Sequence, residues 1–406
     1  MAFGFSKTRC SPIAIDFGAD SLKLLQIIPG DPPQIIAAAA AEVPDHARTD
    51  PAARMAFYLD ALKMMLAQQP FKGKRAVCSI PAYQTLVQHF QITKSEGDEM
   101  DEQIGAHLRE RLNVDPSRLV TRCIDVGQVV RDGASKQEVI CIAAAKDAVM
   151  RFIETAHRAK LDVAGMHSEP WAIVKAFAHL YRRDGDEKRT TCFIDLGAST
   201  TKVVITHGTQ IVFAQNIHAG GDQFSRALAK AENMTFAEAR QRRIAMAQNV
   251  KLSDTAKPAP AAAEPVTAER RGKPGRPSGL AVLDAQISAE LESSSATGGA
   301  PNRIARPEPV EADTHEILVE ELRMAIRYHQ SVFPDRPVEK LIFLGGESRH
   351  VNTCQQIAKS LRIGAQLGDP LARSVKPDAR AGGVDLREAQ PGWSVPFGLC
   401  LLEPAA

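Results

Sequence analysis

Short apolar runs alternate with amphipathic stretches from Ser11 to about Val250. The apolar runs are rich in Ile, Val, Leu and Ala and are interrupted by Gly and Pro, a pattern typical of strands, whereas the amphipathic stretches repeat apolar residues at helical spacing. Predicted strands cover 13–16, 22–28, 34–43, 76–80, 86–92, 119–130, 138–144, 163–167, 191–195, 200–207 and 210–216. Predicted helices cover 53–69, 99–112, 146–160, 169–181, 224–230 and 236–248. This alternation predicts an α/β fold.

The pattern stops between Ser253 and Asp313, where Pro, Ala, Ser, Glu and Arg cluster without a sustained apolar period. Such a segment buries too little apolar surface to offset its chain entropy, so we predict a disordered insertion at 253–313. An insertion without a function is favoured over a specific interaction tail, because insertions in surface loops cost little free energy. Order resumes with a helix over 317–332, a strand over 339–344, a helix over 348–361 and a short C-terminal segment.

Length and charge limit the classes of protein that the chain can represent. At about 100–200 residues per domain, 406 residues suggest several domain-sized units. Lys and Arg total 50 against 48 Asp and Glu, and 5% of residues are aromatic, which gives no reason to expect a nucleic-acid partner. The seven cysteines are scattered and never form a CxxC pair, as in reduced cytosolic proteins. No apolar run approaches the ~20 residues that span a bilayer, and the first ten residues lack the apolar core of a signal peptide. We therefore expect a cytoplasmic protein without direct membrane insertion.

Two segments far apart in the chain are near copies of each other. The first reads IAIDFGADSLK from Ile13 and the second reads CFIDLGASTTK from Cys192. In each, a strand ends in Asp-x-Gly-Ala and is followed by hydroxyl side chains and a strand that carries Lys. The glycine lets backbone N–H groups close on an anion, the hydroxyls add donors, and the carboxylate can hold Mg²⁺ through water. One such turn is ordinary, but two with matched flanks predict a pair that grips the phosphates of a nucleotide from both sides.

A third segment, LIFLGGES from Leu341, is a buried-type strand that runs into a glycine pair and a helix start. Two glycines let a flat ring approach the backbone at the N-terminus of a helix. A plain strand-to-helix turn explains the segment equally well when it is taken alone.

In this order, the three segments resemble the phosphate-1, phosphate-2 and adenosine motifs of the actin-like ATPase superfamily. Within it, the chain resembles the type IV pilus assembly protein PilM family, which is close to the division protein FtsA. The matching segments include CSIPAYQTLVQHFQI, DEMDEQIGAHLRERLNVDPSRL, FIDLGASTTKVVITHGTQIVFAQNIHAGGDQF and VEKLIFLGGESRHVNTCQQIAKSLRIGAQLGDPL. The resemblance implies two RNase H-like lobes around a nucleotide cleft, at 11–185 and 186–402. It also implies an extra subdomain of the FtsA/PilM type at about 73–162.

The resemblance implies ATP and Mg²⁺ as cofactors. The implied nucleotide-binding residues are Asp16, Gly18, Ser21, Asp195, Gly197, Ser199, Thr200, Gly220, Gly221, Arg243, Gly345, Gly346 and Glu347. Of these, Asp16 and Asp195 would hold Mg²⁺ through water, and Arg243 would replace a lysine that relatives carry near the nucleoside. Arg240 departs from the family pattern, because relatives carry an acidic residue there. We expect Lys23 and Lys202 to be solvated rather than bound to phosphate, since lysine is rarely buried.

Glu169 is the candidate catalytic residue, because Glu169-Pro170 resembles the Glu-Pro of bacterial actin homologues. A side chain there would orient water on the γ-phosphate, as phosphoryl transfer requires. The alternative is an ordinary acidic residue in the first turn of a helix. Nucleotide binding is therefore expected, and slow ATP hydrolysis is left open.

In the resembled family a groove in the extra subdomain binds the N-terminal cytoplasmic peptide of PilN, an inner-membrane protein. We expect a PilN-like partner here, with Leu86, Val87, Phe90, Ile92 and the helix 104–112 as groove walls; packing into the core of the protein explains these residues equally well. This implies an assembly scaffold of a pilus or secretion platform that is peripheral to the inner membrane through partners. It would contact other platform proteins, and self-association is left open.

Two other classes of protein are weighed against the scaffold. An FtsA-like filament-forming cell-division protein is disfavoured, because the C-terminal residues contain no amphipathic membrane helix. A sugar-kinase-type phosphotransferase is disfavoured, because no glycine-rich loop carries a catalytic aspartate for a substrate.

Overall fold

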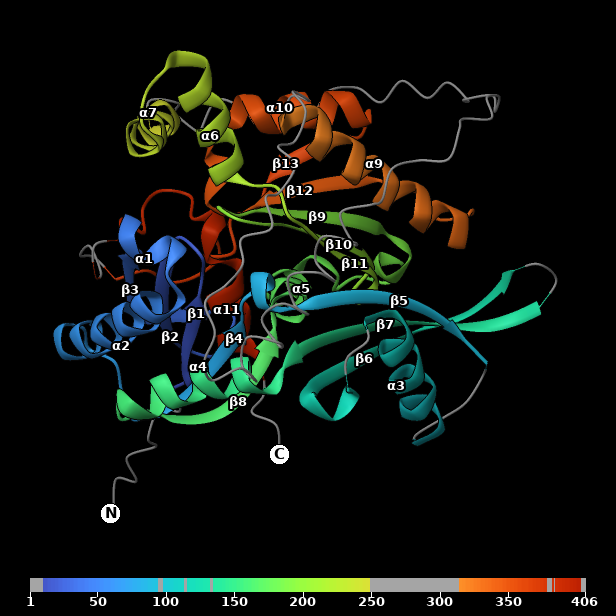
Figure 1. Ribbon diagram of the computed structural model, residues 1–406, viewed down its shortest axis with the longest axis horizontal. Helices are drawn as coiled ribbons and strands as arrows, with labels where there is room; N and C mark the ends of the chain where they lie inside the picture. Colours follow the sequence, from blue (N-terminus) through green and yellow to red (C-terminus); the bar gives the residue numbers. More distant parts are fainter. Residues whose placement is uncertain are drawn as a thin grey trace, which may run out of the picture.

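The computed structural model describes residues 10–93, 98–112, 115–131, 134–248, 314–377, 382 and 384–402. Its strands form two five-stranded sheets and one three-stranded sheet within these residues (Figure 1). The predicted insertion at 253–313 lies outside the described residues.

The first sheet has the order β3-β2-β1-β4-β8. A meander of antiparallel strands, β1 (Ile13–Phe17), β2 (Ser21–Ile28) and β3 (Gln34–Glu42), continues into β4 (Arg75–Ile80) and β8 (Asp162–Ser168), which run parallel to β1. The helices α2 (Pro51–Gln68) and α4 (Lys146–Arg158) pack on each other over one face of this sheet, next to the short helix α1 (Asp45–Thr49). Phe17, Tyr58 and Phe152 meet in that core.

The second sheet repeats this plan with the order β11-β10-β9-β12-β13. Its meander consists of β9 (Thr190–Leu196), β10 (Thr201–His207) and β11 (Gln210–Ile217), and the parallel strands are β12 (Lys340–Leu344) and β13 (Ala365–Leu367). The helices α9 (Thr314–Val332) and α10 (Val351–Leu361) pack with it, and α6 (Gly221–Glu232) and α7 (Phe236–Gln248) lie beside one end. The similar sequence segments are therefore the first hairpins of two sheets with the same topology.

Two central helices join the sheets. The helix α11 (Ser394–Leu401) packs on β1, β2 and β4 of the first sheet, while α5 (Glu169–Phe177) contacts β10 and β11 of the second. The two helices cross so closely that a Cβ atom on Gly398 would lie 1.8 Å from the carbonyl oxygen of Ala172. Glycine allows this crossing because any larger side chain would meet rigid backbone.

The three-stranded sheet, in the order β5-β7-β6, consists of β5 (Leu86–Ile92), β6 (Leu119–Arg131) and β7 (Ala134–Ala145). The helix α3 (Asp98–Leu112) covers one face of this sheet (Figure 1). Their shared core contains Leu86, Phe90, Ile92, Ile104 and Leu108.

Most predicted elements match the structure, and the differences lie at short or irregular segments. The helix α1 was not predicted, since five residues are too few to show helical periodicity. The helix predicted from Ser348 begins at Val351, because the 3₁₀ turn η6 (Gly346–Arg349) precedes it. Short 3₁₀ turns also occur at η1 (Ala82–Gln84), η2 (Pro116–Arg118), η3 (Ala178–Leu180), η4 (Asp186–Lys188) and η7 (Pro391–Trp393). Among the helices of the described residues, none has the length and apolar content needed to cross a bilayer.

Candidate functional site

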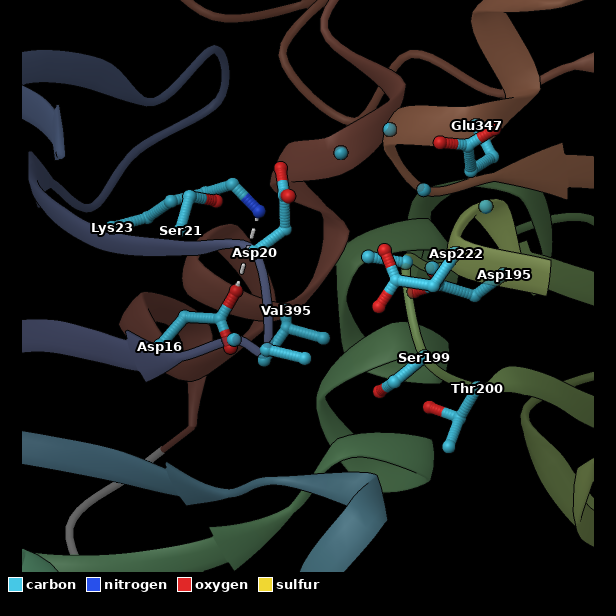
Figure 2. Close-up of a pocket in the computed structure, with 18 of the residues that line it drawn as sticks. Asp16, Asp20, Ser21, Lys23, Asp195, Ser199, Thr200, Asp222, Glu347 and Val395 are labelled. Carbon is cyan, nitrogen blue, oxygen red and sulfur yellow. Dashed lines mark ion pairs between the residues drawn. The ribbon is translucent and has the colours of Figure 1, made fainter. Parts of the chain in front are cut away.

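A cavity of about 450 Å³ lies where the two large sheets face each other. Its walls include the β1–β2 turn, the β9–β10 turn, the start of α6, part of α7 and the turn after β12. Figure 2 shows Asp16 and Ser21 on one wall and Asp195, Ser199 and Thr200 on the other. The turns that the sequence predicted to face one another thus line one cavity.

The two hairpin turns have the same backbone geometry. The N–H of Gly18 donates to the carbonyl of Ser21 over 3.1 Å, and the N–H of Gly197 donates to the carbonyl of Thr200 over 3.0 Å. A Cβ atom on Gly18 or Gly197 would lie 2.8 or 2.7 Å from the same carbonyl oxygens. The tightness of each turn therefore explains the glycine.

The environment of Ser199 suits an anion bound at the β9–β10 turn. Its buried Oγ has no hydrogen-bond partner among the described residues, although the residue lines the cavity. A buried hydroxyl without a partner is costly, and a phosphate oxygen would satisfy it.

The two glycines at the start of α6 have different roles: one packs against a neighbouring turn, and the other lines the cavity. Gly221 lines the cavity, whereas Gly220 is not among the lining residues. A Cβ atom on Gly220 would lie 2.5 Å from the carbonyl oxygen of Gly197. The N–H of Gly221 donates to this same carbonyl over 3.0 Å. Gly220 therefore acts by letting the helix start pack on the β9–β10 turn.

Both glycines after β12 line the cavity, but the space around them differs. Gly345 has a φ of 86°, and a Cβ atom there would lie 2.2 Å from the carbonyl oxygen of Leu196. A Cβ atom on Gly346 would meet no heavy atom within 4 Å in the described part of the chain, although the residue lines the cavity. The positive φ and the close backbone contact therefore require glycine at position 345. The open space at Gly346 leaves room for a flat group.

Glu347 and Arg243 form an ion pair beside this open space. Nη2 of Arg243 lies 2.5 Å from Oε2 of Glu347, and Nη1 donates to the carbonyl of Gly221 over 2.8 Å. Burial raises the pKa of Glu347 above its usual value, and the arginine opposes that rise. Burial and Arg243 also lower the pKa of His350 to about 4. This end of the cavity therefore presents the planar end groups of the Arg243–Glu347 ion pair and the neutral imidazole of His350.

Each hairpin places a lysine directly opposite its aspartate. Asp16 pairs in register with Lys23, and Asp195 with Lys202. The nitrogen-to-oxygen distances are 3.6 Å for Lys23–Asp16 and 3.4 Å for Lys202–Asp195 (Figure 2 marks the first pair). The predicted solvation of Lys202 is wrong, because its side chain is 11% exposed and lines the cavity. Lys23 is 20% exposed and lines it as well. The repeated spacing of Asp and Lys across a tight hairpin was the sequence signal for these cross-strand pairs.

Glu169 begins α5, lines the cavity and belongs to the same charge cluster. Its Oε2 lies 2.8 Å from Nζ of Lys202, and its Oε1 accepts from the N–H of Ala82 over 3.2 Å. Burial raises the pKa of Glu169, although Lys202 opposes this effect. Burial alone would lower the pKa of Lys202, but Asp195 and Glu169 outweigh it and hold that pKa above its usual value. Lys202 is therefore an ammonium ion that ties both carboxylates together.

The residues present fit a magnesium ion only together with further oxygen ligands. Among the described residues, no three His, Cys, Asp or Glu side chains form a metal-binding group. Asp16 and Asp195 lie on opposite walls of the cavity, each beside a lysine. Magnesium keeps several waters and commonly takes one or two carboxylates plus phosphate oxygens, so these two side chains suit an ion that arrives with a nucleotide.

Sequence reasoning missed several charged residues at the rim of the cavity, namely Asp20, Glu42 and Asp222. Arg240, which departs from the family pattern, also lines the cavity and is bonded to Asp20 and Glu42. No local motif signals such contacts, because α7 meets the first hairpin only through the tertiary fold.

A second cavity, of about 500 Å³, lies between the three-stranded sheet and α9. Its lining residues are Val87, Gln88, His89, Phe90, Gln91, His107, Phe213, Ala214, Gln215, Glu321, Met324, Ala325 and Tyr328. Of the predicted groove walls, Val87 and Phe90 line it, and His107 represents the predicted helix. Leu86, Phe90, Ile92, Ile104 and Leu108 belong to the core under α3, so the alternative of internal packing holds for them, although Phe90 also lines the cavity.

Two sheets of one topology, each with a glycine turn facing the same cleft, define the actin-like ATPase fold. A sequence model of the family described as "Type IV pilus assembly protein PilM" matches residues 14–251, which is more than half of the chain. The chain belongs to the PilM family of type IV pilus assembly proteins. Membership favours pilus assembly over the cell-division and phosphotransferase alternatives.

Several solved structures are similar to the chain, and one of them supports this fold. One, titled "PilM-PilN type IV pilus biogenesis complex", has a TM-score of 0.68 at 17% identity and covers 96% of this chain and 98% of that chain. Another is the ethanolamine utilization protein EutJ from Carboxydothermus hydrogenoformans, with a TM-score of 0.46 at 12% identity, covering 97% of this chain and 89% of that chain. No curated protein sequence matches the chain significantly.

Proposed function

We propose that this PilM-family protein binds ATP with Mg²⁺ in the cleft between residues 11–185 and 186–402 and recruits the N-terminal cytoplasmic peptide of a PilN-like inner-membrane protein. The observation that carries the nucleotide part is the shared cavity of the two matched hairpins. The protein would then be a cytoplasmic scaffold at the inner membrane, attached through its partners.

The proposed binding mode assigns each wall a part of the nucleotide. The turns at Gly18 and Gly197 would hold the phosphates with backbone N–H groups and the hydroxyls of Ser21, Ser199 and Thr200. Lys23 and Lys202 add positive charge at the strand ends. Asp16 and Asp195 would hold Mg²⁺ through water, which supplies charge neutralisation for the phosphates when it is bound.

The nucleoside would lie at the other end of the cavity. The open backbone of Gly346 leaves space for a purine ring, next to the ion pair of Arg243 and Glu347. Ile244 and Ala247 of α7 line the same cavity and offer apolar contacts for the ring.

Glu169 is the proposed water-orienting residue, and its environment points to slow turnover. A base must be free to accept a proton or to align water, but Glu169 is ion-paired with Lys202 over 2.8 Å and accepts from Ala82. We therefore infer that ATP acts chiefly as a bound effector that biases the closure of the two lobes.

Calorimetric titration of the full chain with ATP and Mg²⁺ tests the nucleotide part. We expect saturable binding by the natural sequence and a large loss of affinity in Asp195→Asn, which keeps the side-chain shape but removes the charge. Asp147→Asn is the matched control, because Asp147 is exposed on α4 and lies outside the cavity. Absence of binding by the natural sequence, or equal losses in both variants, would refute the proposed site.

The second cavity is the proposed peptide site, because a groove whose walls combine apolar residues such as Phe90, Phe213 and Met324 with polar ones suits a short amphipathic segment. A synthetic N-terminal peptide of the PilN-like protein of the same organism is the probe. Met324 is 40% exposed in the groove, and Met150 is 58% exposed on α4. We expect Met324→Glu to abolish peptide binding and Met150→Glu to leave it unchanged. A peptide that binds Met324→Glu as tightly as the natural sequence would exclude this groove.

A further inference from the structure

An arginine of α7 bridges the mouth of the cleft. Nη2 of Arg240 donates to Oδ1 of Asp20 over 2.8 Å and also bonds Oε1 of Glu42. Asp20 belongs to the β1–β2 turn and Glu42 ends β3, so both carboxylates come from the first sheet. The side chain of Arg240 is only 10% exposed, although it spans a gap between two halves of the molecule.

A second arginine reaches across the cleft in the opposite direction, from the first sheet's side. Arg48 lies on α1, beside the first sheet, and its Nη1 is 3.8 Å from Oδ1 of Asp222 on α6. The same guanidinium also bonds Asp20 and is 7% exposed. Asp20 therefore accepts from both arginines, and the two crossings form one connected network.

The network includes residues from both walls of the cavity that would face the phosphates. Asp20 lies between Gly18 and Ser21 in the first turn, and Asp222 follows Gly221 at the start of α6. All five of these residues line the cavity, as do Arg240 and Glu42. Figure 2 shows Asp20 and Asp222 on facing sides of it. Opening the cleft therefore separates charges that are bonded when it is closed.

We propose that Arg240 and Arg48 are positioning residues that clasp the two halves of the cleft and set how long a bound nucleotide stays. The proposal rests on the nucleotide site proposed above and adds a regulatory property to it. With the clasp closed, the nucleotide is enclosed. Release requires Arg240 to leave Asp20 and Glu42 and requires Arg48 to leave Asp222.

Stopped-flow dissociation of a fluorescent ATP analogue from the full chain tests the clasp. We expect Arg240→Ala to raise the dissociation rate roughly tenfold, because a mostly buried guanidinium loses charge-assisted hydrogen bonds to two carboxylates. Arg240→Lys should recover part of the difference, since it keeps the charge. Arg242→Ala is the control: Arg242 is a neighbour on α7, but it is 45% exposed and pairs with Glu232 on the same side of the cleft.

A double-mutant comparison separates the clasp from a general loss of stability. If Arg240 acts through Glu42, the variant Arg240→Ala/Glu42→Ala should release the analogue no faster than Arg240→Ala alone. Fully additive effects, or an unchanged rate in Arg240→Ala, would overturn the proposal while leaving nucleotide binding intact.

Small-angle scattering of the nucleotide-free chain gives a second readout that does not depend on the nucleotide site. We expect a larger radius of gyration in Arg48→Ala/Arg240→Ala than in the natural sequence or in Arg242→Ala. Equal radii would show that these pairs do not hold the halves together. If the natural sequence binds no nucleotide, the nucleotide site fails, and this comparison alone decides whether the clasp exists.

Discussion

At the scale of single residues, the lysines at the base of the cleft are the main feature. Lys202 lies between Asp195 and Glu169 at 3.4 and 2.8 Å and is largely shielded from water. A buried cation in this setting satisfies two carboxylates at once, and its removal leaves both without compensation. Lys23 does the same for one carboxylate and is more exposed, so the two hairpins differ in how strongly they depend on their lysines.

Lys202→Met therefore tests the role of this ammonium ion in stability. We expect the free energy of unfolding to fall by about 3–5 kcal/mol, the usual cost of breaking a buried ion pair. Lys23→Met should cost less, because its side chain is 20% exposed and serves one partner. Urea unfolding of both variants measures the difference. Adding Glu169→Gln to Lys202→Met should restore part of the loss, and a further loss instead would contradict the electrostatic explanation.

A buried histidine pair predicts how stability responds to acid. Nε2 of His207 lies 3.1 Å from Nε2 of His329, and burial lowers the pKa of each to about 4. Since the ordinary pKa of histidine is about 6.5, the unfolded chain binds protons more readily than the folded one below that pH. Stability should be complete above about pH 6.5 and should fall as the pH drops from 6.5 toward 4.

Melting temperatures between pH 7.5 and pH 5 measure this effect. His207→Gln should melt with a weaker dependence on pH than the natural sequence, because one of the buried imidazoles with a lowered pKa is gone. His157→Gln should retain the full dependence, since His157 is exposed on α4. Parallel melting curves for the natural sequence and His207→Gln would show that other groups cause the acid sensitivity.

At the scale of elements, the crossing of α5 and α11 holds the two sheets together. The helix α11 is buried almost throughout, with Val395, Phe397, Leu399 and Cys400 in the core. A helix that is apolar all around shows no amphipathic period, so the sequence indicated only a short C-terminal segment there. Pro396 and Gly398 have low helix propensity, so they also argued against a helix there. In the structure, Gly398 allows the close contact with α5.

Gly398→Ala tests this contact. The added methyl group would lie 1.8 Å from a backbone oxygen of α5, so the helices must separate, and we expect a loss of about 3 kcal/mol in the free energy of unfolding. Gly364→Ala is the matched control, because an added Cβ there meets no heavy atom of the described residues within 4 Å. Denaturant titration should show a near-neutral control, and equal midpoints for the two variants would contradict the close crossing.

The strands were easier to predict than the helix ends. Alternating or continuous apolar runs located the first hairpins of both sheets to within a residue or two. The start of α6 was predicted at Phe224 but lies at Gly221, because the Gly220-Gly221 pair reads as a breaker while its real role is tight packing on the β9–β10 turn.

At the scale of the whole molecule, the two cavities occupy separate places. In the described part of the chain they have no lining residue in common. The proposed peptide groove lies over β5, β11 and α9, whereas the cleft lies at the turn ends of the two large sheets. Any coupling between the two sites must therefore pass through the elements that lie between them and not through a shared lining side chain.

This separation predicts the effect of a groove mutation on nucleotide binding. Met324→Glu should leave the affinity for ATP unchanged in calorimetry while it removes peptide binding. Should the same substitution weaken ATP binding as strongly as Asp195→Asn does, the two sites would not be independent.

The sequence by itself determined the repeated hairpins, because a tight turn between two paired strands needs glycine at a fixed local position and repeats the same Asp and Lys spacing around it. The resemblance of these hairpins and of further segments to a known family implied the fold class, the family and some of the residues that line the cleft. Only the tertiary structure decided which charges meet across it, such as Arg240 with Asp20 and Glu42, and where Lys202 is buried. Those contacts depend on how distant elements pack, and the strength of an ion pair depends on the burial that this packing creates.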